Sequence, residues 1–280
     1  MTEIPHSGPL PEALGAPGPG AGPDDALFLS DVHLGSGTAE ADREREARLL
    51  AFLETRARRA RQLFVLGDLF DFWFAYAHAI PRRHLAVVRR LAELSEAGIG
   101  VTYFGGNHDF WAGRFLEQEV GATVHDEPAT VEVAGRKLAL MHGDGLAKGD
   151  QGYKFLKGML RNRWTIAAYR AIHPDLGIPF ALWVSRVSRG SRNEDRVDRE
   201  WLYRQLALPR FAEGADAVIT GHYHHPTHFR REGRDFLILG DWVRSFTYAR
   251  LRAGEFALER WDGREGEVLS GPASPYPPGS

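Results

Sequence analysis

The sequence contains no cysteine among its 280 residues. This absence excludes disulfide scaffolds, thiolate metal sites and a cysteine nucleophile. The sequence also lacks an apolar run of about 18–20 residues, which a membrane-spanning helix needs, and its N-terminus lacks the basic and apolar regions of a secretory signal. We therefore expect a chain that neither spans a membrane nor carries an export signal.

Neither sign of charge dominates, because 35 Lys and Arg stand against 37 Asp and Glu, for a net charge of −2. A balanced chain has no general attraction to nucleic acid, so no nucleic-acid partner is expected and an anion must bind at a local patch. The hydrophobic fraction of 43% and the charged fraction of 26% are ordinary for a globular protein. The length fits one large domain or a domain that carries an insertion.

Both ends of the chain are rich in residues that disfavour packing. The first 23 positions hold six prolines and five glycines, with little apolar surface to offset the entropy of ordering. Prolines also accumulate near the C-terminus. We expect a disordered leader over residues 1–24, a folded domain over 25–262 and a flexible tail over 263–280.

Five short apolar runs have the pattern of buried strands, and each is followed directly by a cluster of Asp, His, Asn and Gly. The runs span residues 26–30, 63–66, 101–104, 137–141 and 217–220. Helical patterns over about 40–60 and 81–97 separate the first three, and this alternation indicates βαβ units with parallel strands. Because ligand sites of open α/β sheets lie beyond the carboxyl ends of the strands, the polar clusters should converge on one edge.

The pattern changes after about residue 227. Shorter β-like pieces over 235–239, 245–251 and 255–261 alternate with turn residues. We expect them to form antiparallel strands that complete a second sheet. The expected fold class is therefore α/β.

The polar clusters supply seven candidate metal ligands. These are Asp31, His33, Asp68, Asn107, His142, His222 and His224. Oxygen and imidazole donors suit Mn²⁺, iron or Zn²⁺. Seven donors are too many for one tetrahedral ion, so we expect two ions. Each residue taken singly is also compatible with an ordinary turn, but five coincidences at strand ends favour a metal centre.

The spacing of these donors predicts how they share the ions. In an extended chain the side chains of residues i and i+2 point to the same side. Such a pair can therefore bind a common ion, and the two pairs here are Asp31 with His33 and His222 with His224. A carboxylate has two oxygens and can bridge ions about 3.5–4 Å apart. Asp68 is the candidate bridge because its strand is central in the predicted order.

The five polar clusters are, in chain order, Asp31-Val32-His33, Gly67-Asp68-Leu69-Phe70-Asp71, Gly106-Asn107-His108-Asp109, His142-Gly143-Asp144 and Gly221-His222-Tyr223-His224. Together they resemble the signature of the calcineurin-like metallophosphoesterases. The resemblance implies a four-layer α/β/β/α sandwich with a dinuclear centre, for which Mn²⁺ is the expected metal. It assigns one ion to Asp31, His33, Asp68 and His224. It assigns the other ion to Asp68, Asn107, His142 and His222.

His108 has no place among these ligands but lies next to one of them. It can hydrogen-bond a phosphoryl oxygen or protonate the leaving group. Asp71 matches the family's partner that orients this histidine, although a cap for the following turn is the alternative reading of Asp71.

The segment from about 146 to 204 does not show the pattern of an apolar strand followed by a polar cluster. It is helix-like, and over 154–204 eleven Lys or Arg face five Asp or Glu. A solvated helical face with ordinary core aromatics is one reading. The other is an inserted helical lid, basic and aromatic, over an anionic amphiphile. Such a lid would select the substrate and leave hydrolysis of a small diester intact without it.

Flanking residues narrow the resemblance to the UDP-2,3-diacylglucosamine diphosphatases of lipid A synthesis. That group inserts a helical cap in this interval, and Asp150 and Tyr153 match the Asp-x-x-Tyr at its start. Three further residues are candidate contacts to the glycosyl phosphate, Arg186, Arg189 and Arg192. One branch of the group has arginine where this chain has His108.

The resemblance implies hydrolysis of the pyrophosphate bond of UDP-2,3-diacylglucosamine to UMP and 2,3-diacylglucosamine 1-phosphate, through metal-bound hydroxide attacking the α-phosphorus. Because this substrate carries lipid tails, we expect a cytoplasmic protein held peripherally on the inner face of the cytoplasmic membrane. The sequence does not specify the oligomeric state. The alternatives are another nucleotide-linked or diester substrate and, from a different class, a non-catalytic scaffold, which the complete ligand set disfavours.

Overall fold

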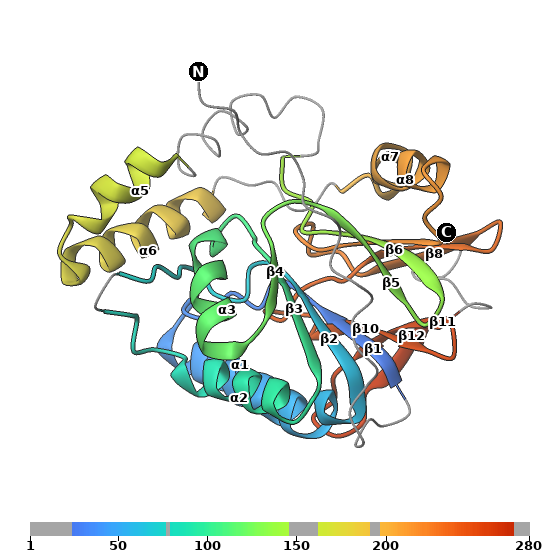
Figure 1. The fold of residues 1–280 in the computed structure, drawn as a ribbon, viewed down its shortest axis with the longest axis horizontal. Coiled ribbons are helices and arrows are strands. Elements are labelled where there is room, and N and C mark those ends of the chain that lie inside the picture. Colours follow the sequence, from blue (N-terminus) through green and yellow to red (C-terminus); the bar gives the residue numbers. More distant parts are fainter. Residues whose placement is uncertain (1–23, 77–78, 146–161, 191–196, 272–280) are drawn as a thin grey trace.

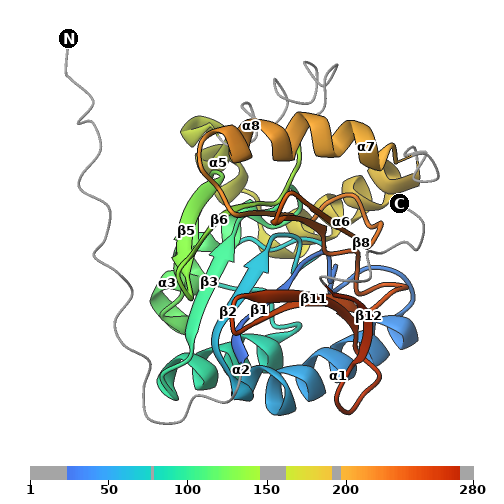
Figure 2. The ribbon, with the colours of Figure 1, turned by 90° about the vertical axis from the view of Figure 1, so that its right-hand side faces the viewer.

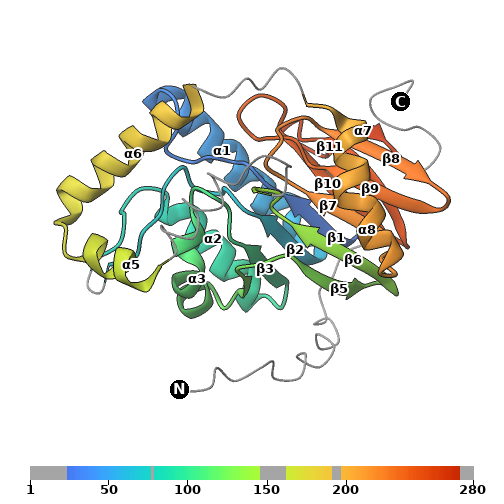
Figure 3. The same cartoon turned by 90° about the horizontal axis from the view of Figure 1, so that it is seen from above.

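The computed structural model describes residues 24–76, 79–145, 162–190 and 197–271. Two β-sheets stack face to face, with α1, α2 and α3 against one sheet and α7 and α8 against the other (Figures 1 and 2). This arrangement is the four-layer α/β/β/α sandwich that the sequence predicted. Helices α5 and α6 project from one side of the layers (Figure 3).

The first sheet has seven strands in the spatial order β12-β11-β10-β1-β2-β3-β4. They span Asp24–Leu29 (β1), Ala60–Leu66 (β2), Gly100–Phe104 (β3), Thr123–His125 (β4), Thr247–Arg252 (β10), Glu255–Arg260 (β11) and Glu267–Ser270 (β12). Strands β1 to β4 are parallel to one another, whereas β10 pairs antiparallel with β1. The parallel strands read as continuous apolar runs because both of their faces are covered.

The second sheet has five strands in the order β5-β6-β7-β9-β8. They span Ala129–Val133 (β5), Arg136–Met141 (β6), Ala217–Thr220 (β7), Thr227–Arg231 (β8) and Arg234–Ile238 (β9). The central strands β6, β7 and β9 are parallel, and the edge strands β5 and β8 pair antiparallel with their neighbours.

Most of the helices cover the outer faces of the sheets, and α5 and α6 are the exceptions among the described helices. They span Ala39–Thr55 (α1), Leu85–Glu96 (α2), Gly113–Val120 (α3), Arg163–Arg170 (α5), Pro174–Gly190 (α6), Arg199–Leu202 (α7) and Leu208–Ala212 (α8), with 3₁₀ turns at Ala57–Arg59 and Phe110–Ala112 and a π-helical turn at Tyr203–Ala207. The Thr38 hydroxyl accepts a hydrogen bond from the Ala41 amide and so caps α1. Leu49, Phe52 and Leu53 lie on the buried stripe of that helix.

Three apolar cores hold the layers together. Phe28 and Phe64 stack with ring centroids 4.8 Å apart between the two sheets. Phe52 packs in the core between the first sheet and its helices. Tyr203 and Phe211 pack in the core between the second sheet and α7–α8. Since both sheets are covered on both faces, the polar clusters remain only at the strand ends.

The prediction that the last three β-like segments complete the second sheet is wrong for two of them. Strands β10 and β11, predicted to complete the second sheet, belong to the first sheet, where β10 pairs with the edge of β1. Strand β9 does lie in the second sheet, where it pairs antiparallel with β8, as expected, and parallel with β7. A hydrophobic pattern identifies a strand, whereas its hydrogen-bonding partner depends on which sheet edge remains unpaired in the folded chain.

The predicted boundaries also shift. Strand β1 already starts at Asp24, the last residue of the predicted leader, and the predicted tail contains β12, which pairs with β11. The last part of the predicted lid, α7 and the turn after it, packs on the second sheet through Leu202 and Tyr203. It belongs to the outer helical layer, because its apolar residues cover a sheet face. Residues 1–23, 146–161 and 272–280 lie outside the described residues.

None of the described helices combines the length and the apolar character needed to cross a lipid bilayer.

Candidate metal centre

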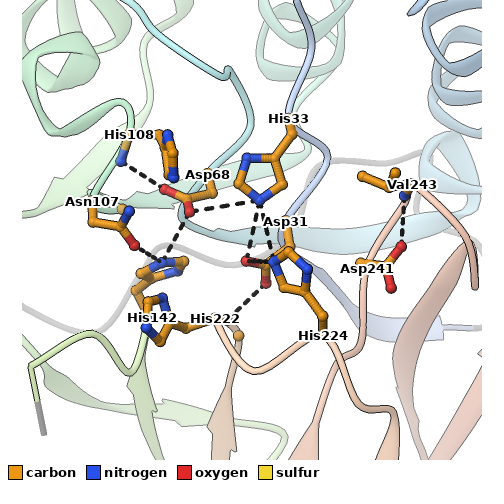
Figure 4. Close-up of polar contacts among 12 residues, drawn as sticks. Asp31, His33, Asp68, Asn107, His108, His142, His222, His224, Asp241 and Val243 are labelled. Atoms are coloured by element: carbon orange, nitrogen blue, oxygen red, sulfur yellow. Dashed lines mark hydrogen bonds and ion pairs between the residues drawn. The ribbon is translucent and has the colours of Figure 1, made fainter. Parts of the chain in front are cut away.

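All seven predicted ligands lie at one edge of the sandwich, in loops that leave the carboxyl ends of the strands (Figure 4). Loops after β1, β2 and β3 of the first sheet carry four of them, and loops after β6 and β7 of the second sheet carry three. The expected convergence on one edge is confirmed, but the edge is formed by two sheets and not by one.

The backbone of these loops is unusual. Positive φ angles occur at Asp31 (53°), His33 (51°), Asp68 (53°), His222 (68°) and His224 (55°), which are half of the non-glycine residues with positive φ in the described chain. The left-handed region is unfavourable for residues that carry a Cβ, and such strain concentrates at functional sites. The prediction that the two i,i+2 pairs are extended is therefore wrong, because the chain turns sharply as soon as each strand ends.

The first group of donors combines the loop after β1 with the loop after β7. The His224 Nε2 atom lies 3.1 Å from Asp31 Oδ1 and 3.2 Å from His33 Nε2. The His33 Nε2 atom lies 3.8 Å from the same Asp31 oxygen. Three donor atoms from Asp31, His33 and His224 therefore face a common point.

The second group combines Asp68, His142 and His222. The His142 Nε2 atom lies 3.3 Å from Asp68 Oδ2 and 3.2 Å from Asn107 Oδ1. The imidazole of His142 is oriented by its Nδ1, which lies 2.8 Å from the Leu66 carbonyl oxygen. His222 and His224 thus belong to different groups, although they are only two residues apart in the sequence.

Asp68 lies between the groups. Its Oδ2 atom is 3.3 Å from His142 Nε2 and 3.8 Å from His33 Nε2. Its other oxygen accepts a hydrogen bond of 2.9 Å from the His108 backbone amide. This position between the two groups agrees with the bridging role predicted for Asp68.

Burial and mutual attraction shift the pKa values of these groups strongly. Burial raises the pKa of the Asp31 carboxyl, but attraction to His224 and His142 outweighs it and brings the pKa down to about 2. Burial lowers the pKa of His33 to about 3. Burial also lowers the pKa of His142, but the Asp68 carboxylate outweighs this and raises it to about 10. Burial likewise raises the pKa of Asp68, but attraction to His142 and His108 outweighs it and lowers the pKa well below its ordinary value. Both carboxylates therefore stay charged although they are buried, and buried carboxylates favour a nearby cation.

The donor set fits divalent cations. Ring nitrogens of His33 and His224 face each other at 3.2 Å, and at least one of the two must present a lone pair. Separations of about 3–4 Å are those of ligands that surround one ion at about 2.0–2.2 Å. The described groups of His and Asp side chains can thus hold divalent metal, with oxygen and imidazole donors only.

His108 and Asp71 lie beside this centre, and a ring nitrogen of His108 lies within 4.8 Å of donor atoms of His33 and Asp68. The rings of His108 and His33 meet edge to face with centroids 5.0 Å apart. The His108 Nδ1 atom is 3.2 Å from the Asp71 carbonyl oxygen but 3.8 Å from Asp71 Oδ1. The two residues are neighbours, as predicted, although their side chains are too far apart for a direct hydrogen bond.

Two buried residues that the sequence did not single out support the ligand loops. Asp109 accepts hydrogen bonds from the backbone amides of Asp68 and Gly106 at 3.2 Å each, and it thereby ties two ligand loops together. Arg45 of α1 donates from Nη1 to the His33 carbonyl oxygen at 2.5 Å. Asp109 was visible in the motif that follows β3, but the sequence held no signal for Arg45, which acts from a helix.

Position 106 requires glycine because its backbone lies very close to Asp68. A Cβ at this position would collide with both the carboxylate and the backbone amide of Asp68. Because a backbone amide cannot move aside, only glycine lets the loop after β3 lie against the central carboxylate.

The predicted lid residues are only partly described. Asp150, Tyr153 and Arg192 lie outside the described residues, and Arg186 and Arg189 belong to α6 with side chains that are likewise outside the description. The described part of the lid, α5 and α6, exposes large apolar side chains, and Trp164 is 72% and Phe180 58% exposed.

The family comparison agrees with this geometry. The family model of calcineurin-like phosphoesterases matches residues 26–226. A protein of Porphyromonas gingivalis named UDP-2,3-diacylglucosamine hydrolase is 33% identical over 85% of this chain and 98% of its own length. Proteins of the same name from Ralstonia nicotianae and Nitrosococcus oceani are 30% and 31% identical, over 90% and 78% of this chain and 94% and 87% of their own lengths. The chain belongs to the calcineurin-like phosphoesterase family.

Proposed function

We propose that the protein hydrolyses the pyrophosphate bond of UDP-2,3-diacylglucosamine and releases UMP and 2,3-diacylglucosamine 1-phosphate. The observation that carries the chemistry is the pair of donor groups joined by Asp68 at the strand ends. The similarity to three proteins named for this substrate, over most of their length, supports the choice of substrate.

The metal assignment belongs to this proposal. One divalent ion is held by Asp31, His33, Asp68 and His224, and the other by Asp68, Asn107, His142 and His222, with Mn²⁺ as the expected metal. When bound, a pair of such ions neutralises phosphoryl oxygens and lowers the pKa of a water molecule. The close contacts within each group and the position of Asp68 between them support this assignment.

His108 and Asp71 complete the proposed catalytic set. The His108 amide fixes one oxygen of Asp68 at 2.9 Å, so the ring is anchored next to the bridging carboxylate. From there the imidazole donates a hydrogen bond to a phosphoryl or leaving-group oxygen. The carbonyl of Asp71, 3.2 Å from Nδ1, holds the ring in place.

The exposed apolar surface of the lid is a further argument for a lipid-linked substrate. Leu176, Phe180 and Trp183 on α6 are 68%, 58% and 57% exposed, a surface suited to acyl chains or to a membrane interface. We propose Asp150, Tyr153, Arg186, Arg189 and Arg192 as the polar contacts of the substrate, and peripheral attachment to the inner face of the cytoplasmic membrane.

The direct test incubates the purified protein with UDP-2,3-diacylglucosamine and Mn²⁺ and measures release of UMP. Wild type should release UMP, and Asp68→Ala should not. Cleavage of bis-p-nitrophenyl phosphate with the lipid nucleotide left intact would contradict the substrate and favour another nucleotide-linked or diester compound.

Membrane attachment is tested separately by sedimentation with vesicles of phosphatidylethanolamine and phosphatidylglycerol. The double variant Phe180→Ala and Trp183→Ala should remain in the supernatant, whereas wild type should sediment. Val268→Ala is the matched control, because Val268 is also an exposed apolar residue, 60% exposed, but lies on β12. Equal sedimentation of all three proteins would contradict attachment through α6.

A further inference from the structure

One hydroxyl of the lid reaches the predicted catalytic pair. Ser185 belongs to α6 and is buried, with 8% of its surface exposed, although much of that helix is exposed. Its Oγ atom lies 3.0 Å from His108 Nδ1 and 3.2 Å from Asp71 Oδ1. The hydroxyl therefore lies between two side chains that are 3.8 Å apart.

The surrounding acceptors determine the direction of these hydrogen bonds. The carbonyl oxygen of Asp71, 3.2 Å from His108 Nδ1, can only accept, so Nδ1 must carry the hydrogen. The same N–H points to Ser185 Oγ, which consequently accepts from His108 and donates its own hydrogen to Asp71 Oδ1. The reverse order would place two acceptors, Nδ1 and the carbonyl, against each other.

We propose that Ser185 is a positioning residue for His108: it links the His108 Nδ1–H to the Asp71 carboxylate and so fixes the tautomer and orientation of the catalytic imidazole. This inference rests on the proposed function, in which His108 acts on the substrate. With the Nδ1–H held in this way, Nε2 is the ring nitrogen that faces substrate, and it donates a hydrogen bond there when Nε2 also carries a proton.

The proposal changes the expected role of the lid. From the sequence we expected the lid to select the substrate only and to be dispensable for a small diester. Because α6 supplies the hydroxyl that orients His108, its docking completes the site even for substrates without acyl chains. Removal of the lid should then slow hydrolysis of every substrate.

The kinetic test uses bis-p-nitrophenyl phosphate with the Mn²⁺-loaded protein. Ser185→Ala should lower kcat about 10-fold or more with little change in KM, as expected when an orienting partner is lost. Ser185→Thr keeps the hydroxyl and should restore kcat to within about 3-fold of wild type. Val184→Ala, a neighbouring change on the exposed face of α6, serves as the control and should have wild-type kcat.

A double-mutant cycle distinguishes positioning from structural damage. In a His108→Ala background, Ser185→Ala should cause no further loss, because its effect passes through the missing imidazole. Additive losses, or wild-type kcat in Ser185→Ala, would overturn the proposal.

A second measurement does not depend on turnover. Nitrogen-15 spectra of histidine-labelled protein, loaded with diamagnetic Zn²⁺, report the tautomer of His108, which His108→Gln assigns by difference. Wild type and Ser185→Thr should show a protected Nδ1–H, and in Ser185→Ala this proton should exchange faster with water. An Nε2–H tautomer in wild type refutes the role of Ser185 whether or not the protein hydrolyses phosphoesters, whereas loss of all hydrolysis with the expected spectra refutes the proposed function alone.

Discussion

Two buried carboxylates lie at opposite ends of the same strand and have different partners. Asp24 begins β1 and forms an ion pair of 2.5 Å with Arg56. Asp31 follows the other end of β1, and in the described chain its ion-pair partners are His224 and His33, at 3.1 and 3.8 Å. Asp24 is thus neutralised by a permanent cation of the protein, whereas Asp31 faces imidazoles, which are metal ligands when neutral.

The backbone differs in the same way. Asp24 lies in regular β-structure, paired with Ala60 of β2, whereas Asp31, His33 and Asp68 adopt strained left-handed conformations. One end of the sheet forms an ion pair within regular β-structure, whereas the other end accepts backbone strain and gathers Asp and His donors that a cation can bind. The four predictions that follow test this contrast.

The largest effect is expected for Asp68→Ala. Loss of the shared carboxylate should reduce turnover by about 1,000-fold or more and weaken binding of both ions, since both groups depend on it. Metal content of the purified variant, measured by mass spectrometry, checks this. Both metals bound at wild-type occupancy would contradict the bridging role. Asp24→Asn, at the other end of the sheet, should keep both ions.

In metal-free protein the larger effect should lie at the other end of the sheet, and the quantity to compare is the free energy of unfolding. Asp24→Asn leaves the Arg56 guanidinium without its closest partner and should lower the free energy of unfolding by about 3 kcal/mol. Asp31→Asn removes the attraction to His224 and His142 but also the burial cost of the charge and its repulsion by Asp68, so it should lower the free energy of unfolding less than Asp24→Asn does. Denaturant unfolding of both variants measures the difference, and equal destabilisation would refute the contrast between the two ends.

Gly106→Ala tests the close approach of the ligand loops. The new Cβ would collide with Asp68, so hydrolysis of a small diester should fall by about 100-fold. Gly100→Ala is the matched control at the start of β3, the strand that precedes the Gly106 loop, where the nearest atom to a new Cβ is Gln62 Cγ at an ordinary 3.5 Å. Steady-state rates of the two variants should differ strongly, and similar rates would mean that the loop adapts.

The smallest effect concerns pH and lies far from the metal centre. Burial raises the pKa of Asp235, but hydrogen bonds from His228 and Arg136 outweigh it and lower the pKa overall. A lowered folded pKa stabilises the protein above the unfolded value of about 3.9, and this contribution is lost as the pH falls through the folded pKa. In metal-free protein, the difference in Tm between wild type and Asp235→Asn should therefore shrink below about pH 4. A difference that stays constant from pH 7 to pH 3 would contradict this.

Much of the candidate site was predictable because its signal is local. An apolar strand that ends in Asp, His or Asn can be recognised one segment at a time, and parallel strands bring such ends together. The same reasoning failed for strand partners, since nothing within the sequence of β10 states that it pairs with β1. It also failed for the loop conformations, because positive φ at His33 depends on hydrogen bonds to the loop after β2.

The sequence by itself determined the donor types, their order and the strands that they follow, since residue chemistry and hydrophobic period are properties of short segments. Only the tertiary structure decided that the ligand edge is formed by two sheets, that the ligand loops adopt left-handed conformations, and that Arg45 and Ser185 reach the site from helices. Contacts between distant segments depend on how layers pack, and packing geometry is a property of the whole folded chain.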